Sequence, residues 1–173
     1  MTLEPTAKVW RYISFAKFFW MLQLKKLWLS NAMFFEDKWE AMPDPSLIKS
    51  STEDALHRLQ RFLTNNRRLT FVSCWNASEH ESHALWRIYC PTSEGVAIQT
   101  TFACLEKSVA PLDVLEVTYN PHELDNILNP YKLATQKRPM FAYEQEVRVV
   151  LHQNLPTPNT QIVLRMALEY LGI

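Results

Sequence analysis

Glycine is scarce in this chain, which contains only Gly95 and Gly172 among its 173 residues. Phosphate-binding loops of the Walker type and the glycine-rich turn of dinucleotide-binding domains each need several glycines close together, because the backbone must approach the phosphate. The sequence therefore excludes both kinds of nucleotide site. A nucleotide bound by this chain would have to be held in another way.

Cysteine is also sparse, and the three present, Cys74, Cys90 and Cys104, show no Cys-x-x-Cys spacing. An odd number of cysteines without that spacing favours neither a zinc site nor the disulfide framework of a secreted domain. We therefore expect a reducing, cytoplasmic location and no metal cofactor.

Net charge is absent as well, since 18 basic and 18 acidic residues give a formal charge of zero. This predicts no strong attraction to nucleic acid or to an anionic membrane unless a local patch supplies it. The best candidate patch, which we interpret as solvated surface, is Arg58, Arg61, Arg67 and Arg68. The apolar stretch 15–24 is well short of the roughly 20 residues of a membrane span, and the N-terminal segment lacks a signal-peptide pattern. We expect no membrane partner.

The pattern of apolar residues predicts one α+β domain over residues 1–173, with a mixed, mostly antiparallel sheet and four to five helices. Predicted strands lie at 8–13, 27–30, 69–75, 96–100, 112–119 and 143–152. Predicted helices lie at 14–25, 51–66 and 79–89, with a closing helix at 159–173 and shorter helical stretches at 101–108, 122–128 and 129–137. Residues 31–50 have no sustained period and are predicted to form a long loop.

The segment 141–151 places two carboxylates and a guanidinium in an otherwise apolar, strand-like run. On an extended strand, Glu144, Glu146 and Arg148 would share one face. Two neighbouring carboxylates can have different pKa values, because mutual repulsion raises one pKa while a nearby cation lowers the other. The pair is thus a candidate for acid–base and electrostatic catalysis. A solvated salt-bridge ladder is the alternative interpretation.

Two further groups of side chains have reactive chemistry. His80 and His83 are three residues apart and could chelate a metal, but the zinc-protease pattern of histidines four residues apart is absent. Cys74 could act as a nucleophile beside a histidine, although a free cysteine in an apolar strand is more typical of a small core residue. We favour the structural interpretation for both groups.

Five blocks of sequence are distributed over nearly the whole chain. They are Val9-Trp10-Arg11-Tyr12, Phe71-Val72-Ser73-Cys74-Trp75, Glu81-Ser82 followed by Leu85-Trp86, Gly95-Val96-Ala97-Ile98, and Tyr143-Glu144-Gln145-Glu146-Val147-Arg148. In this order they resemble a bacterial domain family of unknown function. That family usually places an acidic Asp-Pro-Phe-Glu-Gly-like turn after the second strand, where this chain has only Asp37-Lys38-Trp39-Glu40. The resemblance implies no established activity.

An arginine on an early strand, a serine on a central strand and Glu-x-Glu at the start of a late strand follow one another along the chain. This order resembles the Arg-Ser-Glu layout of ADP-ribosyltransferases, a fold that binds NAD between two small sheets without a glycine-rich loop. The resemblance implies that Arg11, with Tyr12 beside it, contacts NAD and that Ser73 supports the nicotinamide ribose. It also implies that Glu146 stabilises the oxocarbenium-like centre and that Glu144 orients the acceptor.

Two hypotheses follow from these patterns. The first, implied by the resemblance, is an NAD-dependent ADP-ribosyltransferase or NAD glycohydrolase of toxin or phage-defence type, with NAD as substrate and a protein or nucleic acid as acceptor. The second is a noncatalytic interaction or sensor domain, in which exposed aromatic side chains and residues 31–50 bind another protein. In the second hypothesis Arg11 and Arg148 form structural ion pairs with Glu144 and Glu146.

Overall fold

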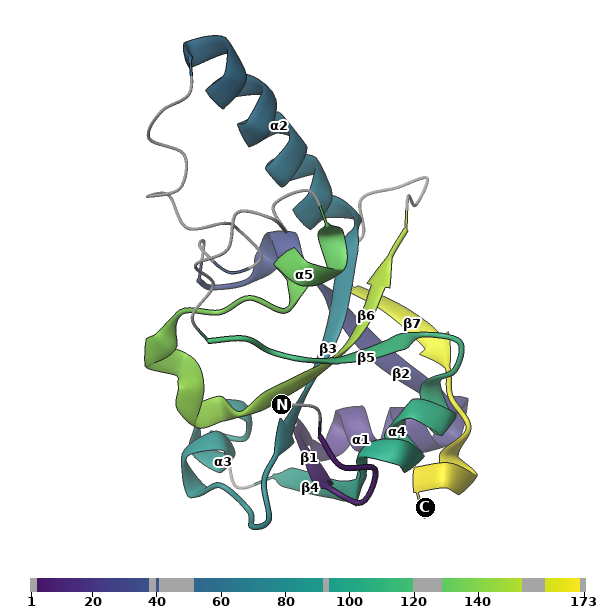
Figure 1. The fold of residues 1–173 in the computed structure, drawn as a ribbon. Helices are drawn as coiled ribbons and strands as arrows, with labels where there is room; N and C mark the ends of the chain where they lie inside the picture. The colour runs from purple at the N-terminus through teal and green to yellow at the C-terminus, as the bar shows by residue number, and fades with distance from the viewer. Residues whose placement is uncertain are drawn as a thin grey trace.

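The computed structural model describes residues 3–37, 40, 52–91, 94–119, 129–153 and 161–171. Within these ranges the chain forms an α+β fold around a seven-stranded antiparallel sheet (Figure 1), which confirms the predicted fold class. The strands are β1 (Lys8–Ser14), β2 (Lys26–Asn31), β3 (Thr70–Ala77), β4 (Gly95–Thr101), β5 (Asp113–Glu116), β6 (Glu146–His152) and β7 (Gln161–Arg165).

The helices begin where the sequence supplies a capping oxygen. They are α1 (Phe15–Leu24), α2 (Glu53–Leu69), α3 (His83–Tyr89), α4 (Phe102–Val109) and α5 (Pro130–Ala134), together with the short 3-10 helices η1 (Ala32–Phe34), η4 (Pro139–Glu144) and η5 (Leu168–Leu171). The side chains that cap the five α-helices are Ser14, Thr52, Ser82, Thr101 and Asn129. Each accepts a hydrogen bond from a first-turn N–H that would otherwise lack a partner. Among the described residues, no helix has the length and apolar character needed to cross a membrane.

Strand β3 is the centre of the sheet, and its two edges are paired differently. One edge pairs with β6 along the range from Thr70 to Asn76. On the other edge, β1 pairs with the end of β3 at Asn76 and Ala77, and β2 pairs with its beginning at Phe71 and Val72. In these registers neither β1 nor β2 pairs with the range 73–75. The sheet therefore opens between β1 and β2, which α1 joins.

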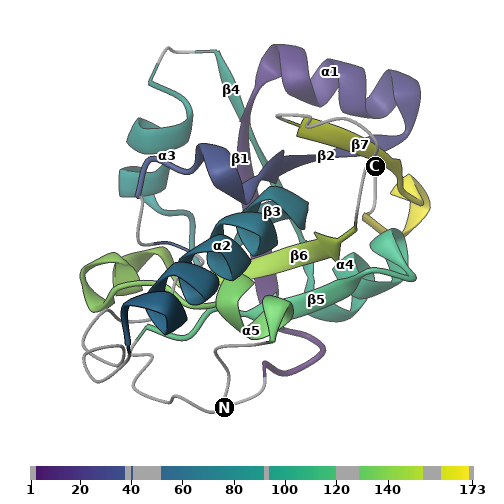
Figure 2. The same cartoon turned by 90° about the horizontal axis from the view of Figure 1, so that it is seen from above.

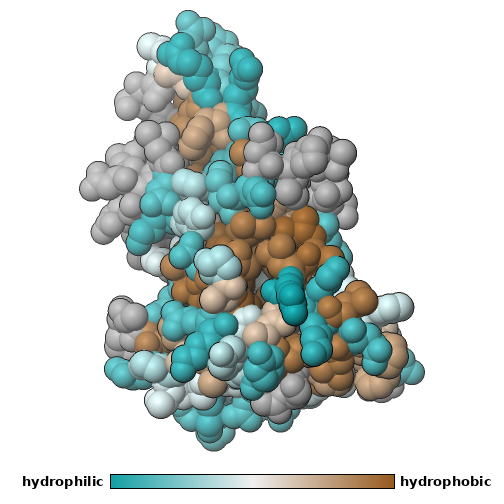
Figure 3. Space-filling view, turned by 90° about the vertical axis from the view of Figure 1, so that its right-hand side faces the viewer, coloured by the Kyte–Doolittle hydropathy of each residue, from teal (hydrophilic) through white to brown (hydrophobic). Residues whose placement is uncertain are grey.

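The two faces of β3 and β6 differ in chemistry. One face contributes Phe71, Trp75, Val147 and Val149 to the main core, where side chains from β1, β2, α1, α4 and η5 also pack. The other face contributes Val72 and Val150 to a smaller core beside α5. The main core reaches the surface on the side where β7 and α4 lie, and a space-filling view of that side shows an apolar area bordered by hydrophilic side chains (Figure 3).

The predicted closing helix at 159–173 is wrong. Residues 161–165 instead form β7, which pairs with β2 from Lys26 to Ser30 at the edge of the sheet. The segment satisfies its backbone hydrogen bonds on this edge and alternates exposed with half-buried side chains, as a strand does. Of the described residues in this range, only those of η5, at 168–171, are helical, and Asn159, the expected cap, lies outside the described residues.

Several other boundaries differ from those predicted. Helix α2 continues past Asn66 to Leu69, because Asn66 is buried in the helix rather than free to end it. Helix α3 begins only at His83, after the Ser82 cap. Part of the predicted loop at 31–50 forms η1, whereas residues 38, 39 and 41–50 lie outside the described residues, as do residues 120–128 with the predicted helical stretch there.

Gly95 provides a test of the packing between β4 and α3. A Cβ atom at this position would lie 2.5 Å from the Cys90 Sγ and 2.9 Å from the Trp86 ring. We expect Gly95→Ala to lower the free energy of unfolding by roughly 1–3 kcal/mol, because the overpacked side chains must shift. Urea denaturation measures the change. Gln99→Ala, at an exposed position of the same strand, is the control, and equal midpoints for the two variants would contradict the predicted clash.

Candidate functional site

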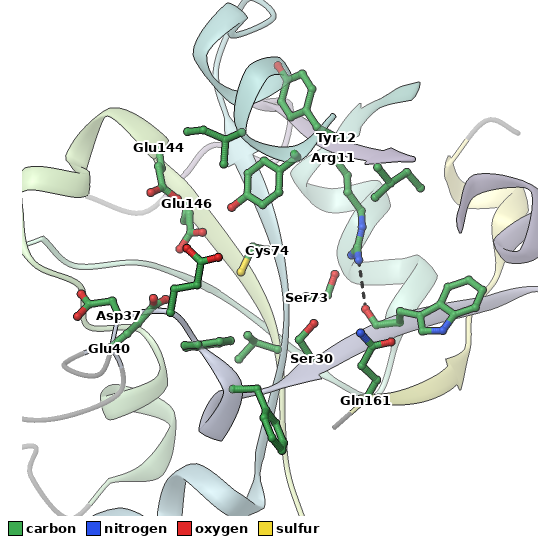
Figure 4. Close-up of a pocket in the computed structure, with 18 of the residues that line it drawn as sticks. Arg11, Tyr12, Ser30, Asp37, Glu40, Ser73, Cys74, Glu144, Glu146 and Gln161 are labelled. Carbon is green, nitrogen blue, oxygen red and sulfur yellow. Dashed lines mark hydrogen bonds between the residues drawn. The ribbon is translucent and has the colours of Figure 1, made fainter. Parts of the chain in front are cut away.

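The main pocket lies at the opening of the sheet between β1 and β2 and has a volume of about 810 Å³. Its wall includes Arg11 and Tyr12 from β1, Ser73 and Cys74 from β3, and Glu146 from β6. In the close-up view, Glu144, Glu146, Asp37 and Glu40 gather on one side of β3, whereas Arg11, Ser73, Ser30 and Gln161 lie on the other side (Figure 4). The pocket thus has an acidic side and a side that contains the Arg11 guanidinium.

Arg11 provides a buried positive charge in the pocket. Its guanidinium donates one hydrogen bond, from Nη2 to the Trp28 carbonyl at 3.2 Å, and lies 5.6 Å from the centre of the Trp75 ring. Nη1 is buried without a hydrogen-bond partner in the described residues, and no carboxylate there forms an ion pair with Arg11. Burial lowers the pKa of Arg11 to about 10, so the group stays charged at neutral pH. An anionic ligand could therefore bind Nη1.

Tyr12 and Ser73 line the same pocket, but both polar groups already have protein partners. The Tyr12 hydroxyl accepts a hydrogen bond of 2.7 Å from the Ser82 N–H at the start of α3. The Ser73 hydroxyl accepts one of 3.2 Å from the Trp75 indole N–H, and Ser73 is almost completely buried. In both contacts the hydroxyl oxygen accepts, and no described residue is seen to accept either hydroxyl proton.

The two carboxylates do not lie on one continuous strand, contrary to the prediction for residues 143–152. Glu144 ends η4 and Glu146 begins β6, with Gln145 between them in the left-handed region at φ 41°. This turn, rather than strand alternation, brings both side chains to the acidic side of the pocket (Figure 4). Both residues are buried, which excludes the solvated salt-bridge ladder.

An ion network along the pocket wall connects these carboxylates to the buried Arg148. Arg148 is completely buried and donates to Glu146 Oε2 through Nε at 3.0 Å and Nη2 at 2.5 Å. Nη2 also donates to Glu40, and Nη1 donates to the Ala134 carbonyl at 2.6 Å. Lys137 Nζ lies 2.8 Å from Glu144 Oε2 and 3.5 Å from Glu146 Oε1. Three carboxylates therefore share two cations.

The network separates the pKa values of the two glutamates. Burial raises the pKa of Glu144, and the charge of Glu146 adds to this effect, although Lys137 opposes it. Burial would also raise the pKa of Glu146, but the charges of Arg148 and Lys137 outweigh burial and hold that pKa below its ordinary value. Glu146 is thus the fixed negative charge, and Glu144 is the group better able to exchange a proton.

Arg11, Ser73 and Glu146 all line this pocket, but they do not project from the same face of the sheet. Arg148 pairs opposite Cys74 and Val149 pairs opposite Ser73, so Glu146 shares a face with Cys74 and not with Ser73. The pocket includes both faces because it lies beside the free edge of β3. A ligand that contacts Arg11 and Glu146 would therefore cross this edge.

Sequence reasoning missed Glu40 and Lys137, the remaining members of the network. Glu40 follows a stretch without periodicity, and Lys137 follows α5, so no pattern marks either residue as buried. An available signal was charge balance, because a fully buried arginine needs more than one acceptor. Of the two proposed ion pairs, the one between Arg148 and Glu146 is present, whereas Arg11 pairs with neither glutamate.

The structure also bears on the alternative reactive groups. Burial raises the pKa of the Cys74 thiol well above its ordinary value, with the charge of Glu146 adding to it, so the thiol stays protonated and is a poor nucleophile. His80 and His83 are exposed beside α3. Within the described ranges, no three His, Cys, Asp or Glu side chains are grouped so that they could hold a metal ion.

Comparison with known proteins gives no match, since no protein-family profile, no curated protein sequence and no solved structure matches this chain. The two resemblances described from the sequence blocks therefore remain predictions.

The ion network predicts a particular pH dependence of stability. Because the folded-state pKa of Glu146 is lowered, its ionised form adds stability above the unfolded value of about 4.3, and this stability is lost as pH falls through the folded-state pKa. Glu146→Gln should cost roughly 3 kcal/mol near neutral pH. The difference from the wild type should shrink as the pH falls below about 5 and on through the lowered folded-state pKa of Glu146.

Urea denaturation at several pH values measures this effect. Glu79→Gln is the matched control, because Glu79 pairs with Lys8 on the surface at 3.1 Å, where an ion pair adds little stability. A cost for Glu146→Gln that stays constant from pH 7 to pH 3 would show that the lowered pKa of Glu146 does not stabilise the fold.

Proposed function

We propose that this chain is an NAD-using enzyme of ADP-ribosyltransferase or NAD glycohydrolase type, acting in the cytoplasm as a toxin or phage-defence effector. The observation that carries the proposal is the charge separation within one pocket of about 810 Å³. Arg11 is buried there without a carboxylate partner in the described residues, and Glu144 and Glu146 line the opposite side. A pocket of this volume is within the usual range for small-molecule ligands.

NAD has the matching charge distribution. Its diphosphate is anionic and its nicotinamide ring is cationic, so the diphosphate fits beside Arg11 and the ring fits beside the glutamates. The free edge of β3 supports the same orientation, because backbone groups in the range 73–75 face the opening without a partner from β1 or β2. Polar backbone groups on such an edge can hydrogen-bond an extended ligand. No glycine-rich loop is needed for this mode of binding.

The two glutamates suit the two halves of the reaction. When the bond between nicotinamide and ribose breaks, its electron pair goes to the ring nitrogen, which becomes neutral, and positive charge develops on the ribose. Glu146, held ionised by Arg148 and Lys137, would stabilise that charge from a fixed position. Glu144 would take the proton from the attacking water or acceptor hydroxyl as the new bond to the ribose carbon forms.

A second candidate function is a noncatalytic interaction or sensor domain. The observation that favours it is the engagement of Glu146 itself, since Arg148 binds one carboxylate oxygen and Lys137 lies 3.5 Å from the other. A glutamate used in this way can be purely structural. This hypothesis expects Glu146→Gln to leave the biological effect intact in a variant that remains folded.

Nicotinamide release tests the proposed enzyme. Purified protein incubated with NAD and cell lysate should release nicotinamide, measured by chromatography, and Glu146→Gln should lower the rate by about 10²–10³-fold, as expected for loss of an electrostatic stabiliser. Glu79→Gln should keep the full rate. Circular dichroism must show that both variants are folded. Release by the wild type that does not exceed that of Glu146→Gln would reject the proposal.

The pH dependence of the rate tests the role of Glu144. As a general base with a raised pKa, Glu144 should make the rate increase with pH through that pKa. Glu144→Gln should lower the rate by about 10²–10⁴-fold and remove this limb of the profile. Glu81→Gln, at an exposed carboxylate that binds the Trp86 indole, is the control. If the rate of Glu144→Gln still increased with pH as in the wild type, the group that titrates would not be Glu144.

A further inference from the structure

Helix α1 has an unusually apolar outer surface. Of the fourteen large apolar side chains that are exposed among the described residues, four lie on this ten-residue helix: Phe15, Phe19, Trp20 and Leu24, exposed by 57%, 48%, 53% and 45%. We call these four residues the α1 outer face. The inner side of α1 contributes Met21, Phe18 and Leu22 to the main core. The helix is therefore apolar on nearly all sides, and such a helix is normally covered by another apolar medium.

The position of α1 leaves its outer face free within the fold. The helix lies along the outer edge of the molecule, beside β7 and opposite α5 and β5 (Figure 2). The exposed fractions of the four side chains show that no described residue covers them.

The charge on α1 and at its C-terminal end is basic. Between Glu4 and Glu36 the chain carries five basic residues and no acidic one. Three of these, Lys17, Lys25 and Lys26, lie on or immediately after α1, and none forms an ion pair with a described residue. Across the β2–β7 pairing, Lys26 stands opposite Arg165, which adds a further positive charge at this end of the helix. Glu94, whose carbonyl accepts from the Phe15 N–H, is at the other end.

We propose that the α1 outer face binds the surface of an anionic lipid bilayer. Aromatic and aliphatic side chains with lysines beside them are the composition of helices that lie in the membrane interface. The apolar side chains enter the boundary between headgroups and acyl chains, and the lysines contact anionic headgroups. The zero net charge of the whole chain provides no general attraction, so binding depends on this local surface. This inference is independent of the proposed NAD chemistry.

Vesicle sedimentation of the full chain tests the inference. The wild type should sediment with vesicles of phosphatidylcholine and phosphatidylglycerol in equal parts and should bind much less to pure phosphatidylcholine. The double variant Phe19→Ser/Trp20→Ser should reduce partitioning by at least about tenfold, because the bilayer contact depends on buried apolar area. Lys17→Gln/Lys25→Asn should weaken binding to the anionic vesicles, and added salt should do the same. Asn at position 25 preserves the left-handed helix end.

Leu56→Ser/Met140→Ser is the matched control, because it removes two exposed apolar side chains from other parts of the surface. It should bind vesicles as the wild type does. Urea denaturation of each variant verifies folding. Equal binding to both vesicle types, or full binding by Phe19→Ser/Trp20→Ser, would overturn the proposal. The α1 outer face would instead bind a second copy of the chain if the wild type bound no vesicles and light scattering showed a dimer. Phe19→Ser/Trp20→Ser would then convert that dimer to a monomer.

Discussion

The structure depends on the burial of one guanidinium. Arg148 is completely buried, and its charge is balanced by Glu146 and Glu40, while Nη1 donates to the Ala134 carbonyl. A buried charge without partners is very costly, so these three contacts must form together. They connect β6 to the end of α5, 14 residues earlier in the chain, and to Glu40, which is 108 residues away in sequence. The acidic side of the pocket is built on this connection.

The same network determines what the pocket can do chemically. Three carboxylates share Arg148 and Lys137, so the cations cannot fully balance every negative charge. Glu146 receives most of the stabilisation and has a lowered pKa, whereas the pKa of Glu144 is raised. Two carboxylates of similar intrinsic acidity thereby become a fixed charge and a proton acceptor. The two glutamates differ because Glu146 pairs with both Arg148 and Lys137, whereas Glu144 pairs with Lys137.

The sequence predicted those helices and strands whose structure is determined by neighbouring residues in the chain. Alternation and capping predicted β1, α1 and β2 almost to the residue, because each is decided by nearby residues. The structure of residues 161–165 was not predicted, because the apolar run Ile162, Val163 and Leu164 is compatible with either a helix or a strand. Pairing with β2, which is distant in sequence, selects the strand. The acidic side of the pocket was predicted only in part. The pairing of Glu40 with Arg148 spans 108 residues, and no local pattern contains it.

Helix α1 contributes side chains both to the pocket and to the α1 outer face. It connects β1 to β2, and the divergence of these strands from β3 creates the opening in which the pocket lies. Lys17 and Met21 of α1 line that pocket, while Phe19 and Trp20 face outward. The Arg11 hydrogen bond to the Trp28 carbonyl also spans the opening from β1 to β2. A contact that displaced α1 would change the spacing of these strands, and with it the position of the buried Arg11 guanidinium in the pocket.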